Sequence, residues 1–171
     1  MDVRVGQQVE PFDPRAALAG LLPELRAFAR LLAGSRAEAD DLVQEAVLRM
    51  LGALDGFRPG TSLRAWAFTV LRNAFYESHR RRRREAARIA ASGPVEEGRP
   101  APQEHQAGMR DLARGLASLT PSLREAVILV GAQGLSYEDA AQVCGVPVGT
   151  IKARVSRGRR LLAAALDRVT A

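Results

Sequence analysis

The segment from Leu135 to Arg160 constrains the fold most, because it contains two short helical patterns joined by a glycine. Ser136 stands three residues before Asp139, so its side-chain oxygen can accept a hydrogen bond from a free amide of the first helical turn. Gly145 suits a tight turn whose backbone needs a positive φ angle. Pro147 can open the next helix, because its missing N–H would have no partner there anyway. The pattern predicts a helix-turn-helix.

The second helix of this segment is rich in cations, which lie at Lys152, Arg154, Arg157, Arg159 and Arg160. A cationic helix after a tight turn is typical of proteins that read the major groove of DNA. Ala141 and Ile151 fit the angle between two helices, but they would fit a plain helical hairpin equally well. The caps, the proline and the cations together favour DNA binding over that alternative.

The charge of the chain supports a polyanionic partner. Its formal net charge is +6 over 171 residues, although a basic surface without a partner is the alternative interpretation. Cys144 is the only cysteine, which excludes a disulfide framework and fits a reducing cytoplasm. We find no signal peptide and no apolar run long enough to cross a bilayer, so we expect a cytoplasmic protein with no membrane partner.

Helical periodicity and composition divide the chain into two small all-α domains joined by a flexible linker. We expect a loose tail over 1–13, a first domain over 14–90, a linker rich in proline and glycine over 91–105, and a second domain over 106–171. In the first domain, helices are expected over 15–32 (with a kink or restart at Pro23), 36–54 and 62–88. In the second, they are expected over 106–119 and, after an N-cap at Thr120, over 121–133, ahead of the helix-turn-helix.

The expected helix over 36–54 has one broad apolar side, opened by a capping box of Ser35 and Glu38. The opposite side is mostly acidic and polar, with one apolar residue, Leu48, among the charges. The polar residues there are Asp40, Asp41, Gln44, Glu45 and Arg49. Such a face is suited to docking on another protein, but it also fits a solvated helix that places negative charge near its N-terminus. Periodicity alone leaves both interpretations open.

The expected helix over 62–88 is apolar nearly all round, so it is either the centre of a bundle or shares its surface between a core and a ligand. Five consecutive arginines, Arg80–Arg84, follow its aromatic residues. A charge run is often only solvated, but cations beside aromatic residues suit the backbone and the unstacked bases of single-stranded DNA. Trp66 is more typical of a core residue than of a base-stacking one.

The order of these pieces resembles the extracytoplasmic-function type of bacterial RNA polymerase sigma factor, of the sigma-70 family. The matching strings are ADDLVQEAVLRML, FRPGTSLRAWAFTVLRNAF and LTPSLREAVILVGAQGLSYEDAAQVCGVPVGTIKARVSRGRRLL. The resemblance implies a region 2-like bundle that docks on core polymerase and melts the −10 element, and a region 4-like helix-turn-helix for the −35 element. The string over 130–159 is similar to the subgroup that directs the general stress response, whose members are held by a small anti-sigma factor.

The resemblance also implies roles for individual residues. Contacts to core polymerase would come from Asp41, Gln44, Glu45, Leu48 and Arg49. Contacts to the melted −10 strand would come from Arg58, Gly60, Thr61, Ser62, Arg72, Asn73, Arg80 and Arg81. Facing the −35 element would be Lys152, Ala153, Arg154, Ser156 and Arg157, with phosphate contacts from Thr150, Arg159 and Arg160.

Three other functions are alternatives to a sigma factor. A helix-turn-helix repressor or activator would bind a palindrome as a dimer, and it leaves Arg80–Arg84 unexplained. A sigma-like decoy that only binds an anti-sigma factor would have less need of cations on the recognition helix. An enzyme is not expected, because the sequence shows no catalytic constellation and no metal-ligand cluster. We therefore expect no cofactor, no metal and no small-molecule substrate; the expected partners are core RNA polymerase, promoter DNA and a small anti-sigma factor.

Overall fold

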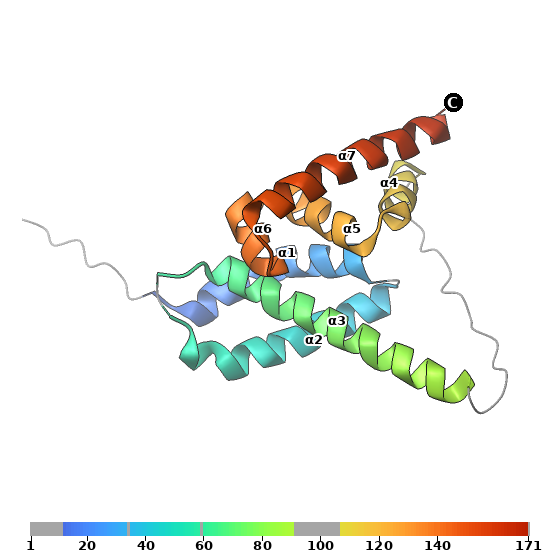
Figure 1. Ribbon diagram of the computed structural model, residues 1–171. Helices are drawn as coiled ribbons and strands as arrows, with labels where there is room; N and C mark the ends of the chain where they lie inside the picture. The colour runs from blue at the N-terminus through green and yellow to red at the C-terminus, as the bar shows by residue number, and fades with distance from the viewer. Residues whose placement is uncertain (1–11, 34, 59, 91–106, 171) are drawn as a thin grey trace, which may run out of the picture.

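The computed structural model describes residues 12–33, 35–58, 60–90 and 107–170, and all regular structure within these ranges is helical (Figure 1). The expected all-α fold is therefore confirmed. In chain order the elements are α1 (Pro14–Leu32), α2 (Arg36–Ala53), the 3₁₀ turn η1 (Leu54–Gly56), α3 (Leu63–Ala90), α4 (Ala107–Ser118), α5 (Pro121–Val127), the π-helical turn η2 (Ile128–Ala132), α6 (Tyr137–Cys144) and α7 (Val148–Thr170).

The N-terminal domain, which we define as the described residues from 12 to 90, is a bundle of α1, α2 and α3. The rings of Phe28 and Phe68 meet at its centre, 5.1 Å apart, and both are fully buried. The expected apolar side of α2 faces this core, and Met50 has no exposed surface. Leu48, on the opposite side, is 70% exposed, as the periodicity of the sequence predicts.

The C-terminal domain, residues 107–170, consists of α4 to α7 and the turn η2. The long helix α7 lies across α4, α5 and α6 (Figure 1). Gly158 makes this packing close, since a Cβ atom at that position would lie 2.5 Å from Cγ2 of Val127. A larger residue at this position would force the Val127 side chain or one of the two helices to shift.

The helix-turn-helix is formed by α6 and α7, as the sequence predicts. The Ser136 hydroxyl oxygen accepts a hydrogen bond from the Asp139 amide at 2.9 Å, and the Ser35 hydroxyl caps α2 in the same way at 3.2 Å. Gly145 has φ 65°, a left-handed conformation that a side chain would disfavour. Ile151 is fully buried at the angle between the two helices.

Three local expectations differ from the structure. Helix α1 runs without interruption through Pro23, so the proline does not restart the helix, and the alternative of a kink stays a prediction. Thr120 precedes α5 with Pro121 at the first position, but no side-chain hydrogen bond caps that helix. The helix expected over 121–133 widens after Val127 into a π-helical turn, in which the Gln133 amide bonds to the Ile128 carbonyl at 2.9 Å. The expected linker over 91–105 and most of the expected tail lie outside the described residues.

The two domains pack against each other. Helix α3 contacts α1 and α2 on its own domain and α6 on the other, and α1 also contacts η2 (Figure 1). This position accounts for the nearly uniform apolarity of the helix, because α3 buries surface toward both domains. The structure places α3 in the bundle core, as one of the two explanations predicts. Its further buried surface faces the C-terminal domain, and a surface shared with a ligand stays a prediction.

Candidate docking and nucleic-acid surfaces

One face of α2 carries exposed acidic, polar and apolar residues in a single stripe. Asp41, Gln44 and Leu48 are exposed at helical spacing, and Leu51 continues the row with 42% of its surface exposed. Leu51 was not among the residues expected there, although its position three residues after Leu48 was a usable signal. We call these four residues the α2 stripe. Two exposed leucines beside an acidic side chain suit a protein partner.

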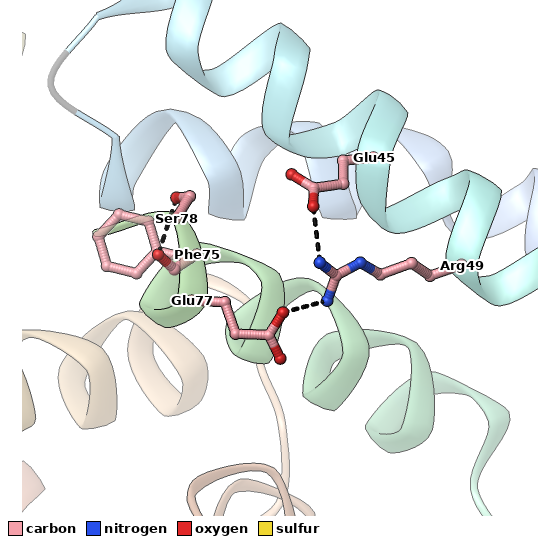
Figure 2. A network of polar contacts seen from close by, with 5 residues as sticks. All are labelled: Glu45, Arg49, Phe75, Glu77 and Ser78. Atoms are coloured by element: carbon pink, nitrogen blue, oxygen red, sulfur yellow. Dashed lines mark hydrogen bonds and ion pairs between the residues drawn. The ribbon is translucent and has the colours of Figure 1, made fainter. Parts of the chain in front are cut away.

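Arg49 and Glu45 lie beside the α2 stripe but are already paired within the chain. The Arg49 guanidinium donates to Glu45 on its own helix and to Glu77 on α3, both at 2.6 Å (Figure 2). These carboxylates raise the pKa of Arg49, with the hydrogen bond to Glu77 as the largest contribution and partial burial opposing it. Glu77 was not anticipated, because it comes from a helix distant in sequence. Arg49 therefore bridges α2 and α3, in addition to any contact outside the chain.

The loop between η1 and α3 holds four of the residues expected at the −10 strand. Arg58, Gly60 and Thr61 are exposed, and the Thr61 hydroxyl donates to the Arg58 carbonyl at 2.8 Å. Ser62 is half-buried, and its hydroxyl accepts from the Ala65 amide at 3.1 Å, which caps the start of α3. Ser62 thus has a structural role as a helix cap, whereas its contact with DNA stays a prediction.

Aromatic rings line the same loop. Phe57 lies between Phe12 and Trp66, with ring centroids 6.4 and 5.7 Å away. Trp66 is half-buried and packs against the domain core, and Phe12 is 58% exposed. A partly exposed aromatic row beside Arg58 has the composition of surfaces on which bases of single-stranded nucleic acid stack.

Arg72 and Asn73 were expected to act together, but the structure separates them. Asn73 is exposed on α3, whereas Arg72 is turned toward the C-terminal domain. The Arg72 guanidinium donates to both oxygens of Glu125, at 2.5 and 3.3 Å, and lies 4.7 Å from the ring centroid of Tyr76. Burial works against the charge of Arg72, yet the hydrogen bond and charge of Glu125 leave its pKa raised.

The arginine run extends along the exposed end of α3. Arg80 and Arg81, which were expected to meet the DNA backbone, are exposed and line an open surface depression together with Arg83 and Arg84. Arg82 points to another side and pairs with Glu38 of α2. Several guanidinium groups along one depression form a surface of concentrated positive charge, which attracts phosphate.

The recognition helix α7 presents most of the residues expected at the −35 element to solvent. Exposed positions are Lys152, Ala153, Ser156, Arg157, Arg159 and Arg160, and the half-buried ones are Thr150 and Arg154. The Lys152 ammonium lies 5.7 Å from the ring centroid of Tyr137, a distance at which the ring face attracts a cation. The structure thus brings all eight onto one helix that the N-terminal domain leaves accessible.

Sequence patterns did not predict the structural roles of Arg124 and Glu125. Arg124 donates to the carbonyls of Leu116 and Ala117, both at 2.8 Å, and so caps the C-terminal end of α4. Burial lowers the pKa of Arg124. Glu125, beside it, is 1% exposed and reaches across to the N-terminal domain. Neither role could be found from local patterns, because the partners lie on other helices.

Two further features were sought in the described part of the chain: a metal-binding cluster and a membrane-spanning helix. It contains no cluster of three or more His, Cys, Asp or Glu side chains placed to hold a metal ion. None of its helices combines the length and the apolar character that crossing a bilayer requires. Cys144 is buried, and burial raises the pKa of its thiol to about 12. A neutral, enclosed thiol of this kind is inert as a nucleophile.

Two family models match this chain: Sigma-70 region 2 over residues 18–85, and Sigma-70 region 4 over residues 109–162. The first covers the N-terminal bundle and the second covers the helix-turn-helix domain. These matches bear out the expected identity of both domains.

Individual relatives agree with the family models. The ECF RNA polymerase sigma factor EcfG of Rhodopseudomonas palustris (strain TIE-1) is 48% identical over 146 residues, which cover 85% of this chain and 80% of that protein. The structure is similar to that of the sigma factor RpoE of Bartonella quintana, solved in complex with the anti-sigma factor NepR. That match has a TM-score of 0.77 at 41% identity and covers 90% of this chain and 96% of the other.

A more distant structure shares the same arrangement. CnrH, solved in complex with the cytosolic domain of CnrY, matches with a TM-score of 0.67 at 27% identity, over 91% of this chain and 88% of the other. CnrH is an RNA polymerase sigma factor of Cupriavidus metallidurans. With both sigma-70 regions matched and a relative sharing nearly half of its residues, the chain belongs to the extracytoplasmic-function group of the sigma-70 family of RNA polymerase sigma factors.

Proposed function

We propose that this sigma factor binds core RNA polymerase and promoter DNA through two surfaces of opposite chemistry. The α2 stripe docks on core RNA polymerase, while the cationic face of α7 reads the −35 element in the cytoplasm, where both partners occur. The observation that carries the proposal is that both surfaces are exposed and lie on different domains. Neither domain alone holds enough contacts to specify a promoter, but two modest sites joined by one chain gain from effective concentration.

At the −35 element, Lys152 and Arg157 are the strongest candidates for base contacts. Both are exposed and can reach into a major groove, where one good Arg or Lys pair to guanine is worth about 1–3 kcal/mol of discrimination. Ala153 and Ser156 have short side chains, so the shape of the DNA contributes part of the specificity. Thr150, Arg159 and Arg160 then hold phosphates and fix the register.

At the −10 element, the loop residues and the arginine run capture a melted strand. Arg58 and Thr61 are exposed in the loop that carries the aromatic row, Asn73 is exposed on α3, and Arg80 and Arg81 supply positive charge farther along that helix. Stacking of bases on aromatic rings offsets the cost of unpairing them. The chain can therefore stabilise an open strand without ATP.

We further propose that a small anti-sigma factor controls this chain in a general stress response. RpoE of Bartonella quintana was solved with the anti-sigma factor NepR, and its structure matches both domains of this chain in one superposition. The resemblance of residues 130–159 to the stress-response subgroup supports the same regulation. An anti-sigma factor that binds across two packed domains would hold the docking and DNA surfaces out of reach of polymerase.

Run-off transcription from a promoter library tests the proposed function. Core RNA polymerase is assayed with and without the purified chain. We expect transcripts only in its presence, from starting points that share two short elements at fixed spacing. Equal transcription in both reactions, or no binding of the chain to core polymerase, would contradict the proposal.

A further inference from the structure

The contact between the domains contains one carboxylate that is almost completely buried. Glu125 of α5 is 1% exposed, and both of its oxygens accept hydrogen bonds from Arg72 of α3. The Tyr76 hydroxyl lies 3.5 Å from the same carboxylate. The buried Cys144 thiol lies against Glu125 as well. Side chains from two domains therefore meet in one polar cluster, inside an interface of packed helices.

A second arginine of α3 makes a parallel contact. Arg64 donates to the backbone carbonyl of Gln133 at the end of η2 and, at 2.7 Å, to Glu24 of its own domain. The π-helical turn brings the Gln133 carbonyl to this position. Arg64 and Arg72 lie about 12 Å apart along the helix, at 1.5 Å per residue, and both reach toward the C-terminal domain.

The chemistry of Glu125 resembles that of a phosphate group. A guanidinium binds a carboxylate and a phosphate with the same paired, parallel hydrogen bonds. Tyr76 extends the comparison, because its ring stacks on the guanidinium and its hydroxyl approaches the anion. Arg72 is thus held as a nucleic-acid-binding arginine would be, with a carboxylate of the same chain in the place of the nucleic acid.

We propose that Glu125 is an internal latch that occupies Arg72 and closes the two domains, so that the chain cannot bind single-stranded DNA through Arg72 until the domains separate. This inference rests on the proposed function, the capture of a melted −10 strand, and on the contact with that strand that the family resemblance implies for Arg72. Arg72 has two mutually exclusive partners: Glu125 in the closed chain and a DNA phosphate in the open one. The latch therefore couples separation of the domains to the availability of Arg72, while the exposed residues of the −10 surface stay accessible in both states.

Two substitutions separate the latch from the DNA contact. Glu125→Gln removes the charge of the carboxylate at nearly constant volume and leaves Arg72 in place. Arg72→Gln breaks the same pair but also removes the cation. Glu138→Gln is the matched control, because Glu138 is an exposed glutamate of the same domain. Circular dichroism establishes that all variants retain the helical content of the parent chain.

Small-angle X-ray scattering of the full chain measures closure directly. We expect a larger radius of gyration for Glu125→Gln and for Arg72→Gln, and no change for Glu138→Gln. If Glu125→Gln unfolds its own domain, Arg72→Gln still tests the latch, because Arg72 lies outside that domain's core. An unchanged radius in the folded variants would overturn the latch, whatever the transcription assay shows.

Binding of a dye-labelled pool of random single-stranded oligodeoxynucleotides tests the competition, since phosphate contacts carry no sequence information. The apparent affinity should rise with the open fraction. We expect a severalfold gain for Glu125→Gln and no gain, or a loss, for Arg72→Gln. If both variants are expanded and yet bind the oligodeoxynucleotides with equal affinity, the claim that Glu125 and DNA compete for Arg72 is overturned. Failure of run-off transcription would instead count against the proposed function, because scattering does not depend on it.

Discussion

The two surfaces that we propose for DNA binding differ in how accessible they are when the two domains are packed together. On α7, Lys152, Arg157, Arg159 and Arg160 are exposed, whereas Arg72 of α3 is paired with Glu125. A duplex reader needs only an accessible helix, but capture of a melted strand is useful only after polymerase has engaged the promoter. In the closed chain, the proposed duplex contacts of α7 are therefore accessible, whereas the proposed single-strand contact of Arg72 is not.

The domains also differ in how their cores are built. The N-terminal bundle places large aromatic rings, Phe28 and Phe68, at its centre. The C-terminal domain depends on close helix approach, with Gly158 of α7 against Val127 and Gly115 of α4 against Leu162. One core is therefore sensitive to lost volume, and the other is also sensitive to added volume.

The largest expected effects come from deleting one core side chain in each domain. Phe68→Ala should lower the stability of the N-terminal domain by about 3–5 kcal/mol, and Ile151→Ala that of the C-terminal domain by about 2–5 kcal/mol. Trp66 is the only tryptophan, so its fluorescence during urea unfolding reports on the N-terminal domain, while circular dichroism reports on both. If Ile151→Ala shifts the Trp66 transition as far as Phe68→Ala does, the two domains unfold as one unit and the comparison fails.

A smaller effect is expected from adding one methyl group to α7. Gly158→Ala should destabilise the C-terminal domain by about 1–3 kcal/mol, because the new Cβ would overlap Val127. Gly149→Ala is the matched control on the same helix, since nothing lies within 4 Å of the position that its new methyl group would take. That change should stabilise the chain by about 0.4–1 kcal/mol. Thermal unfolding followed by circular dichroism measures both; two changes of the same sign would argue against close α5–α7 packing.

Local sequence signals predicted the local structure well. Ser35, Ser136 and Gly145 occupy the caps and the turn that their neighbours in sequence imply. The exposure of Leu48 followed from helical periodicity alone. These features depend on residues within a few positions of one another, and a single sequence contains that information.

Contacts between distant helices could not be predicted in this way. Glu125 and Arg72 are 53 positions apart, and nothing near either residue indicates that the other will cover it. The same holds for Arg49 and Glu77, which lie 28 positions apart on α2 and α3. Tertiary packing decides whether a charged residue faces solvent, a partner or another helix. Arg49 and Arg72 were therefore expected to contact a partner outside the chain, but each also pairs with a glutamate on another helix.

The smallest expected effect compares the serine caps of the two domains. Ser35→Ala and Ser136→Ala each remove one hydrogen bond to a free helix amide, which costs about 1 kcal/mol. Ser35→Ala should shift the Trp66 transition, while Ser136→Ala should shift only the signal of the C-terminal domain. The same urea experiment measures both variants. A shift of the Trp66 transition of equal size in the two would show that the domains unfold as one cooperative unit.

The division of labour between the domains is tested most directly by measuring, on the same two variants, affinity for core RNA polymerase and for duplex DNA carrying the −35 element. Asp41→Ala/Leu48→Ala changes exposed residues of the α2 stripe, and Lys152→Ala/Arg157→Ala changes exposed cations of α7. We expect the first variant to lose polymerase binding and keep DNA affinity, and the second to do the reverse. If either variant loses both activities while still folded, or if the first still competes normally for core polymerase, the proposed assignment of the two surfaces is contradicted.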